Sequence, residues 1–417
     1  MSAIERQPLV PRLRFPEFVG QDFREVQLMD VTAECTERNG DDISTMPVMG
    51  VSKTEGIVPM KERLIASDIS RYKIVQKNWF AYNPMRLNIG SIAQWKGEES
   101  ILVSPDYVVF KCLNGSDFQV DPSYLNHFRQ SDAWGSFVNE GGDGGVRVRI
   151  YYKDLARLRL PLPCTKEQQE IADCLSSLDE LIAAENQKLE IVQTHCAVLM
   201  QQILPREGEA APRLRFPEFR KRSPWKSKTL SEIAAIRSGS TPSRAEPAFY
   251  SGGTIPWVKT TDLNNGFIVR TEECVTPAAK VKVNPVGSVL VAMYGGFKQI
   301  GRTGYLTVPA ATNQAISVLN ADENEVLPIY LLTWMNARVG YWKRIASSSR
   351  KDPNITGTDV ANFPISYPDK DEQQKIADTV ASVNRGIEAQ IQKITCLTAH
   401  KTGLLQQLFP AMGEVPA

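Results

Sequence analysis

Residues 171–203 read IADCLSSLDELIAAENQKLEIVQTHCAVLMQQI and are followed closely by Pro205. Mostly apolar side chains recur here in alternating steps of four and three, the heptad pattern of a coiled-coil helix. The ten positions are Ile171, Leu175, Leu178, Ile182, Glu185, Leu189, Val192, Cys196, Leu199 and Ile203. At about 1.5 Å per residue, such a helix would rise roughly 48 Å between its first and last apolar residues.

The same pattern returns later in the chain, in residues 376–408. Its ten positions are Ile376, Val380, Val383, Ile387, Gln390, Ile394, Leu397, Lys401, Leu404 and Leu408. Two stripes of equal length and register predict helices that pack against each other, antiparallel if the repeated units are related by a pseudo-two-fold axis. Glu185 and Gln390 would then form polar positions near the middle, which fix register at some cost in stability. The alternative is that each stripe is only the buried face of an amphipathic helix within its own domain.

Further repeats flank these helices, so the chain consists of two tandem copies. The motif Glu-Gln-Gln-x-Ile-Ala-Asp occurs at 167–173 and 372–378, and the octamer Pro-Arg-Leu-Arg-Phe-Pro-Glu-Phe occurs at 11–18 and 212–219. The repeats predict an N-terminal segment (1–19), a first globular domain (20–163), a central helix (164–205), a linker (206–219), a second globular domain (220–368), a C-terminal helix (369–410) and a tail (411–417).

The two long middle segments share little sequence. Both alternate β-branched runs with turn signals, and strands are expected at 107–110, 146–150, 287–293 and 312–319. A short helix is expected at 328–337. We therefore predict an α+β fold: two globular mixed α/β domains separated by two long antiparallel coiled-coil helices, with pseudo-two-fold symmetry.

Composition narrows the class of protein. The 417 residues carry 48 Lys and Arg against 47 Asp and Glu, so any basic surface must be local. The N-terminal residues do not resemble a signal peptide, and the chain lacks an apolar run long enough to span a bilayer. Seven cysteines form no Cys-x-x-Cys pair and there are three histidines, so we expect reduced thiols in the cytoplasm and no structural metal.

Catalytic motifs are missing. The sequence contains no Gly-Lys dipeptide and therefore no Walker A phosphate loop. The segments 83–86 (Asn-Pro-Met-Arg) and 352–355 (Asp-Pro-Asn-Ile) lack the residues of an adenine methyltransferase motif, and we find no Ser/His/Asp or Cys/His arrangement. Asp369 and Glu372 are interpreted as charges at the start of a helix rather than as nuclease carboxylates. We predict a chain without catalytic residues.

Groups suited to DNA occur in both middle segments. Amides and guanidinium groups can bond base edges in pairs, while hydroxyl and ammonium groups suit phosphates. The candidate DNA-binding residues are Arg86, Asn88, Gln94, Lys96, Arg147, Arg149, Ser240, Thr241, Ser243, Arg244, Lys259, Thr260, Lys298, Gln299, Arg302, Asn313, Gln314, Ser348, Arg350 and Lys351. Each one taken alone could equally be ordinary solvated surface.

The sequence resembles the specificity (S) subunits of bacterial type I restriction–modification systems along essentially its whole length. The paired Glu-Gln-Gln helices carry the resemblance together with a set of shorter motifs. These are Trp225-x-x-x-x-Leu230, Gly239-Ser-Thr-Pro242, Ile255-Pro-Trp257, Gly287-Ser-Val-Leu290, Ile300-Gly301 and Asn313-Gln314, with Phe80-x-Tyr-Asn83, Gly90-Ser-Ile92 and Ser104-Pro-x-Tyr107 in the first copy.

The resemblance implies that 20–163 and 220–368 are target recognition domains, each reading half of an asymmetric, split site in double-stranded DNA. The helices would be the spacer, and a rod of roughly 48 Å exceeds one DNA turn of about 34–36 Å. Two methyltransferase (M) subunits would dock on the helices and octamers, and restriction (R) subunits would join them. S-adenosylmethionine would belong to M, and ATP and magnesium to R, with no cofactor in this chain.

The resemblance also implies a circular organisation, with residues 1–18 near the end of the second helix.

Two other functions stay open. One is a coiled-coil scaffold for proteins that does not read DNA, and the other is a self-contained DNA methyltransferase.

Overall fold

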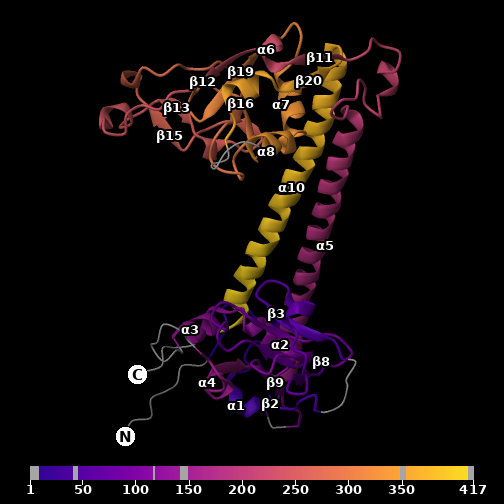
Figure 1. Cartoon of the computed structure of the whole chain (residues 1–417). Helices are drawn as coiled ribbons and strands as arrows, with labels where there is room; N and C mark the ends of the chain where they lie inside the picture. The colour runs from indigo at the N-terminus through magenta and orange to yellow at the C-terminus, as the bar shows by residue number, and fades with distance from the viewer. Residues whose placement is uncertain (1–8, 41–45, 116–117, 141–148, 348–353, 412–417) are drawn as a thin grey trace. The chain divides into compact units, whose positions relative to one another are not determined.

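The computed structural model describes residues 9–40, 46–115, 118–140, 149–347 and 354–411 (Figure 1). It divides into two compact units, unit 1 (residues 1–186 with 392–417) and unit 2 (residues 187–391). Four candidate residues, Arg147, Ser348, Arg350 and Lys351, lie outside the described residues. No helix within the described ranges is long and apolar enough to cross a membrane.

Two uninterrupted helices of 39 residues each, α5 (Thr165–Ile203) and α10 (Lys370–Leu408), confirm the prediction from the heptads. Because the units divide both helices, each unit contains one segment of α5 and one of α10. The two segments lie side by side within each unit (Figure 1).

Contacts between the helices establish their direction. In unit 1, Lys401 bonds Asp179 and Lys393 bonds Glu185. Residue numbers on α10 therefore decrease along the contact as residue numbers on α5 increase. In unit 2, Ile203 shares a core with Ile376. The pair is therefore antiparallel, and the alternative of two helices confined to separate domains is wrong.

The heptad positions of both helices are buried or half-buried, while most residues between them are exposed. Glu185 and Gln390 are 9% and 8% exposed. Glu185 accepts a hydrogen bond of 2.6 Å from Lys393, and half-buried Lys401 donates to Asp179 and to Gln130 at 2.6 and 2.8 Å. The polar side chains of the stripe thus have partners of their own.

The described residues of unit 1 form two four-stranded sheets and one two-stranded ribbon. The first sheet has the order β2 (Thr32–Cys35), β9 (Val108–Cys112), β6 (Phe80–Tyr82), β7 (Ile92–Gln94). The second has the order β4 (Gly56–Pro59), β3 (Val48–Ser52), β8 (Ile101–Val103), β5 (Lys73–Val75). The ribbon pairs β1 (Arg24–Gln27) with β10 (Arg159–Leu162), and the short helices are α1 (Leu28–Val31), α2 (Pro122–Phe128), α3 (Asp132–Glu140) and α4 (Tyr152–Leu155).

Unit 2 repeats this plan. Its larger sheet has the order β12 (Ala234–Ser238), β19 (Ile316–Ala321), β16 (Val289–Ala292), β17 (Thr303–Leu306), β14 (Gly266–Ile268). The smaller sheet has the order β15 (Glu273–Val275), β13 (Ile255–Val258), β18 (Ala311–Thr312). The ribbon pairs β11 (Lys226–Thr229) with β20 (Pro364–Tyr367), and the helices are α6 (Leu230–Ile233), α7 (Pro328–Asn336), α8 (Val339–Ser347) and α9 (Gly357–Ala361).

The two domains are therefore the same fold despite their divergent sequences. The order β2-β9-β6-β7 matches β12-β19-β16-β17, and the parallel pair β3–β8 matches β13–β18. The strands predicted at 107–110 and 287–293 and the helix at 328–337 are present. The single strand predicted at 312–319 is wrong, because residues 313–315 form a turn between β18 and β19, which belong to different sheets. The strand expected at 146–150 is also wrong for its described residues. Arg149 and Ile150 form no strand, and the Ile150 N–H donates to Pro84 O of another loop instead.

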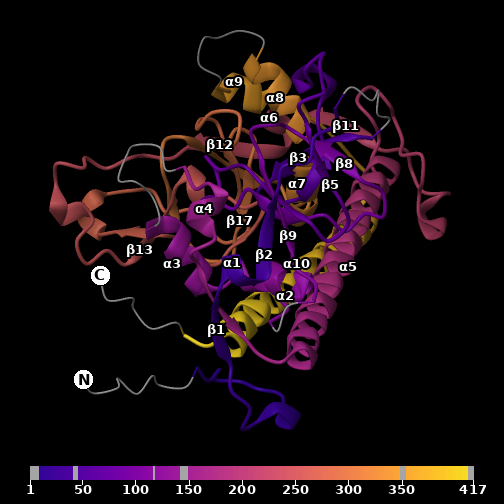
Figure 2. The ribbon, with the colours of Figure 1, turned by 90° about the horizontal axis from the view of Figure 1, so that it is seen from below.

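The long helices complete the core of each domain. In unit 1, Ile171 and Leu175 of α5 pack with Tyr124 and Phe128 of α2 and with Phe409, just after α10. Figures 1 and 2 both show α2 beside the N-terminal part of α5. In unit 2, Ile376 and Val380 of α10 pack with α7 in the same way. Each helix start is therefore fixed rigidly to one globular domain.

Candidate functional site

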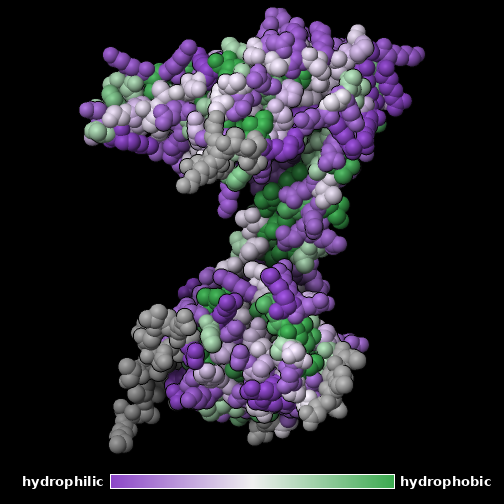
Figure 3. Space-filling model, in the orientation of Figure 1, coloured by the Kyte–Doolittle hydropathy of each residue, from purple (hydrophilic) through white to green (hydrophobic). Residues whose placement is uncertain are grey.

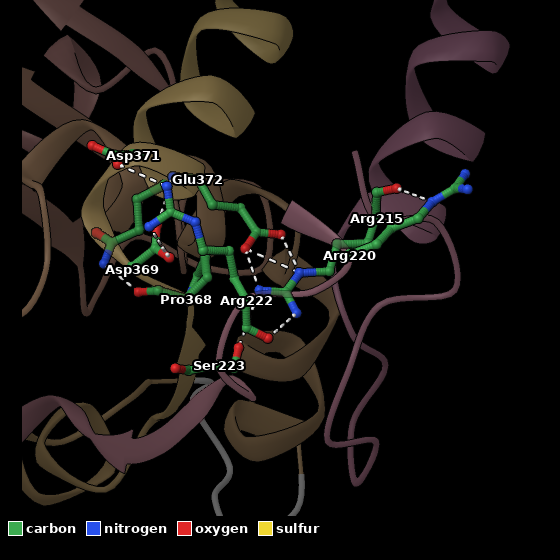
Figure 4. A network of polar contacts seen from close by, with 9 residues as sticks. Arg215, Arg220, Arg222, Ser223, Pro368, Asp369, Asp371 and Glu372 are labelled. Atoms are coloured by element: carbon green, nitrogen blue, oxygen red, sulfur yellow. Dashed lines mark hydrogen bonds and ion pairs between the residues drawn. The ribbon is translucent and has the colours of Figure 1, made fainter. Parts of the chain in front are cut away.

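A buried ion pair joins the octamer to the start of each long helix. In unit 2, Arg215 donates to the Glu372 carboxylate from Nε at 2.9 Å and from Nη2 at 2.7 Å (Figure 4). Arg215 also donates to the carbonyls of Arg222 and Ser223, and the carboxylate raises the pKa of its guanidinium. In unit 1, Arg14 binds Glu167 at 2.8 and 2.7 Å in the same manner.

Each octamer also contacts the last turn of the other helix. The Leu13 N–H donates to Gln407 O in unit 1, and the Leu214 N–H donates to Gln202 O in unit 2, both at 2.9 Å. An octamer thus ties the start of one helix to the end of its antiparallel partner. The contact of Leu13 with the end of α10 confirms the expected place of the N-terminal segment for its described residues, which begin at Leu9.

The first glutamine of each motif serves a similar purpose. Gln168 accepts from the Asp121 N–H and donates to Gln119 O and Pro163 O, which connects α5 to the segment before α2. Gln373 makes the matching bonds to Leu327, Glu325 and Pro368. Both glutamines are almost completely buried.

The interpretation of Glu372 as a helix-start charge is therefore incomplete. Asp369 accepts the Glu372 N–H and acts as the expected cap. The Glu372 carboxylate itself is 1% exposed and lies in the ion pair with Arg215. Among the described residues, no group of three or more His, Cys, Asp and Glu side chains could hold a metal ion.

Most candidate residues of unit 2 lie together around the smaller sheet. The Ser240 N–H donates to Thr312 O, and its carbonyl accepts from Trp257 Nε1. The Gln314 N–H lies 3.4 Å from Thr241 Oγ1. The chain can turn this closely because residue 239 is glycine: a Cβ there would lie 2.2 Å from Thr312 O.

The cations of this surface have carboxylate partners. Arg244 binds Glu273 at 2.8 Å while stacking over the rings of Tyr250 and Trp257, and Lys259 binds both Glu272 and Glu273. These hydrogen bonds raise the pKa of Lys259, and Lys259, followed by Arg244, lowers the pKa of Glu273. Sequence reasoning missed the two glutamates because nothing in the local sequence relates them to Arg244.

The β16–β17 loop (residues 293–302) adjoins the same surface, since the Met293 N–H donates to Ala315 O. Lys298 is exposed there, and Gln299 and Arg302 are half-exposed. Exposed Ser243 and half-exposed Thr260 and Asn313 complete the unit 2 set.

In unit 1 the candidate residues gather less closely. Arg86 and Asn88 are exposed on the β6–β7 loop (residues 83–91), and the bond from Ile150 to Pro84 brings exposed Arg149 to this loop. Lys53, which the sequence did not single out, also adjoins the loop, with its Cγ 3.7 Å from the Cβ position of Gly90.

Gln94 and Lys96 lie on and after strand β7. Lys96 is exposed, whereas Gln94 is 8% exposed and donates to Asn78 Oδ1. Gln94 therefore faces the protein interior rather than solvent.

The fold also brings together serine, histidine and aspartate. His127 of α2 lies 2.9 Å from Ser176 Oγ through Nε2, but its Nδ1 is 3.9 Å from Asp179 Oδ2, too far for a hydrogen bond. Asp179 instead accepts from Lys401, and burial lowers the pKa of His127 to about 4. This arrangement is a buried polar contact between helices rather than a catalytic triad.

The family model described as "Type I restriction modification DNA specificity domain" matches residues 61–194 and 222–395. The chain belongs to this family. The two matched segments cover most of each globular domain and large parts of α5 and α10, which agrees with the tandem repeat.

Two curated relatives are specificity subunits. The EcoR124I/EcoR124II subunit of Escherichia coli is 24% identical over 60% of this chain and 63% of its own length. The MjaIX subunit of Methanocaldococcus jannaschii is 29% identical over 39% of both chains. The alignments thus span less than two thirds of these relatives.

Two solved structures share the fold over nearly the whole chain. The S subunit of a type I system from M. genitalium has a TM-score of 0.60 at 14% identity, covering 97% of this chain and 100% of that one. A chain from a study of complex assembly in the type I R-M system has a TM-score of 0.57 at 16% identity, with 93% and 97% covered.

Proposed function

We propose that this family member is the DNA-recognition subunit of a type I restriction–modification complex. Each mixed α/β domain would read one half of a bipartite, asymmetric site in double-stranded DNA. The observation that carries the proposal is that the two domains share a fold but differ in the side chains that their loops expose. The two domains share strand order and the helix-end ion pairs, yet equivalent loops present different side chains, as expected of two readers with different half-sites.

The helix pair supports a role as spacer. A continuous helix of 39 residues is about 57 Å long, which exceeds one turn of DNA. Each helix belongs to both units, and buried contacts fix its start to a globular domain. The helix length would therefore set the separation of the two half-sites in DNA.

The partners we propose are two M subunits and the R subunits that join them. Two matched helix-end assemblies, one in each unit, would give two copies of one partner equivalent docking sites. Figure 3 shows apolar surface on the helix pair. Ile191 and Val198 are exposed one heptad apart on α5, and Ile391 is exposed on α10. Adenine methylation with S-adenosylmethionine would belong to M, and ATP- and magnesium-dependent restriction to R, so this chain would be non-catalytic.

A cytoplasmic location fits this role. The seven cysteines are free, as expected of thiols in a reducing compartment.

Reconstitution with the M subunit from the same operon tests the proposal. The complex should protect and methylate a duplex containing a two-part motif, whereas the chain alone should not transfer methyl groups from S-adenosylmethionine. Methylation by the purified chain would favour the self-contained methyltransferase.

A charge-removal variant separates the recognition subunit from the scaffold. Arg244→Ala combined with Lys298→Ala should weaken DNA binding and reduce its salt dependence while leaving the M complex intact. Unchanged DNA binding would favour the scaffold without DNA readout.

A further inference from the structure

The β6–β7 and β16–β17 loops are built alike although their sequences differ. Each follows the same strand of the shared topology and contains a buried branched aliphatic residue, Leu87 at 2% exposure and Ile300 at 1%. Each then turns through a glycine with positive φ, Gly90 at 91° and Gly301 at 76°. The loops therefore occupy equivalent places in the two domains.

Both loops expose two large apolar side chains. Met85 and Ile89 are each 50% exposed in unit 1, and Tyr294 and Phe297 are 45% and 48% exposed in unit 2. Exposed apolar residues are ordinary when scattered singly, but a pair at the same loop in both copies indicates a binding surface.

The charged side chains of both loops are all positive. The first contains Arg86 and the second contains Lys298 and Arg302, and neither contains an aspartate or glutamate. Lys53 and Arg149 add cations beside the first loop. Apolar tips flanked by cations and by the amides of Asn88 and Gln299 suit a ligand that combines stacked bases with phosphates.

Internal hydrogen bonds fix the backbone of both loops. The Arg86 N–H donates to Asn83 O, and the Arg86 carbonyl accepts from the Ser91 N–H, both at 3.0 Å. In the second loop, Gln299 N–H donates to Gly296 O, and its side chain packs over Gly295, where a Cβ would lie 2.3 Å from Oε1. Binding would thus require little ordering of the loop.

We propose that these loop tips contact the bases of DNA through their apolar side chains, Met85 and Ile89 in one half-site and Tyr294 and Phe297 in the other. This inference rests on the proposed function and names the residues that would read DNA by apolar contact. The adjacent cations would bind the phosphates that flank the contacted bases.

An M subunit is the other occupant to consider, and the structure favours DNA. Two copies of one partner require matching surfaces, as the pairs Arg14–Glu167 and Arg215–Glu372 match. The loop tips do not match, because one pair is aliphatic and the other is aromatic. Loops that occupy equivalent places but expose different side chains are suited to contact two different base sequences.

The experiment uses the full chain in complex with the M subunit from its operon and the duplex motif that this complex methylates in cells. Tyr294→Ala/Phe297→Ala and Met85→Ala/Ile89→Ala form a matched pair of double variants, and all four side chains are exposed enough for alanine to leave the core intact. Affinity is measured by fluorescence anisotropy on the full motif and on duplexes altered in one half-site at a time. We expect each double variant to lose about tenfold in affinity or more.

Half-site dependence decides the result. Tyr294→Ala/Phe297→Ala should cause no further loss of affinity on a duplex whose half-site for residues 220–368 is already scrambled. Met85→Ala/Ile89→Ala should likewise cause no further loss of affinity on a duplex whose other half-site is scrambled. 2-Aminopurine in the motif should brighten on binding if the side chains insert between stacked bases. Affinity lost without brightening would support contact with base edges.

Two outcomes overturn the inference. One is a variant complex that binds the motif as tightly as the wild type, and the other is a variant chain that no longer assembles with M. A wild-type complex that binds no duplex specifically would instead refute the proposed function, so the two failures are distinguishable.

Discussion

The ion pair between Arg215 and Glu372 should be among the most stabilising polar contacts in unit 2, and Glu372→Gln tests this. The side chains of Arg215 and Glu372 are 15% and 1% exposed, and Arg215 makes three contacts of 2.7–3.1 Å with the carboxylate. Removing one partner of a buried pair costs about 3–5 kcal/mol because the other charge stays buried. Arg215 keeps the carbonyls of Arg222 and Ser223, so we expect a cost of about 2–3 kcal/mol.

Urea unfolding followed by tryptophan fluorescence measures this cost, since four of the seven tryptophans, Trp225, Trp257, Trp334 and Trp342, belong to unit 2. Glu207→Gln is the matched control within unit 2: its pair with Arg344 is exposed, and its loss should cost less than about 0.5 kcal/mol. Arg215→Met/Glu372→Leu should lose less stability than Glu372→Gln alone, because no charge is left buried.

A loss for Glu372→Gln no larger than that of the control would refute the reasoning. So would an Arg215→Met/Glu372→Leu variant whose loss equals the sum of the losses of Arg215→Met and Glu372→Leu measured singly, because that result excludes coupling between the side chains.

Three further predictions concern pH, backbone packing and charge. Burial lowers the pKa of His127 to about 4, with Lys401, Lys96 and Arg129 adding to the decrease and Asp179 opposing it. The unfolded chain therefore binds more protons between about pH 4 and 6.5, so the free energy of unfolding should fall by about 3 kcal/mol as pH falls through this window. His127→Gln should flatten that part of the pH profile, and an unchanged slope would contradict the assignment. Gly239→Ala should destabilise unit 2 by about 2–4 kcal/mol in urea titrations, since its Cβ would overlap Thr312 O, whereas Gly340→Ala in α8 meets nothing within 4 Å and should be neutral or stabilising. Glu273→Gln should release Arg244 and Lys259 for phosphates, giving affinity for DNA a few-fold higher and a steeper salt dependence in anisotropy titrations, and weaker binding would be the contrary result.

The helices were predictable from the sequence because their signal is local and long. Ten heptad positions leave few other ways to bury the stripe, and the tandem repeat supplied the antiparallel direction. The shared fold of the two domains was less accessible, because equivalent strands such as β6 and β16 are short and retain burial rather than identity.

Long-range pairings lay beyond what the sequence could show. Arg14 and Glu167 belong to repeated motifs, yet they are 153 residues apart in the chain. A repeated motif indicates a shared role in the two copies but does not show which residues it contacts. Gln94 illustrates the opposite problem: its amide suggested base contact, but its position on β7 between buried neighbours turns it inward.

Sequencing of methylated bases in a host that expresses this chain with its M subunit tests the central claim most directly. The account predicts methylated adenines in one asymmetric motif, made of two specific parts separated by a fixed run of unspecified bases. Replacing residues 220–368 with the corresponding segment of another family member should change one part of the motif and leave the other part and M binding intact. A continuous motif, or a replacement that changes both parts, would contradict the proposal that each domain reads its own half of the site.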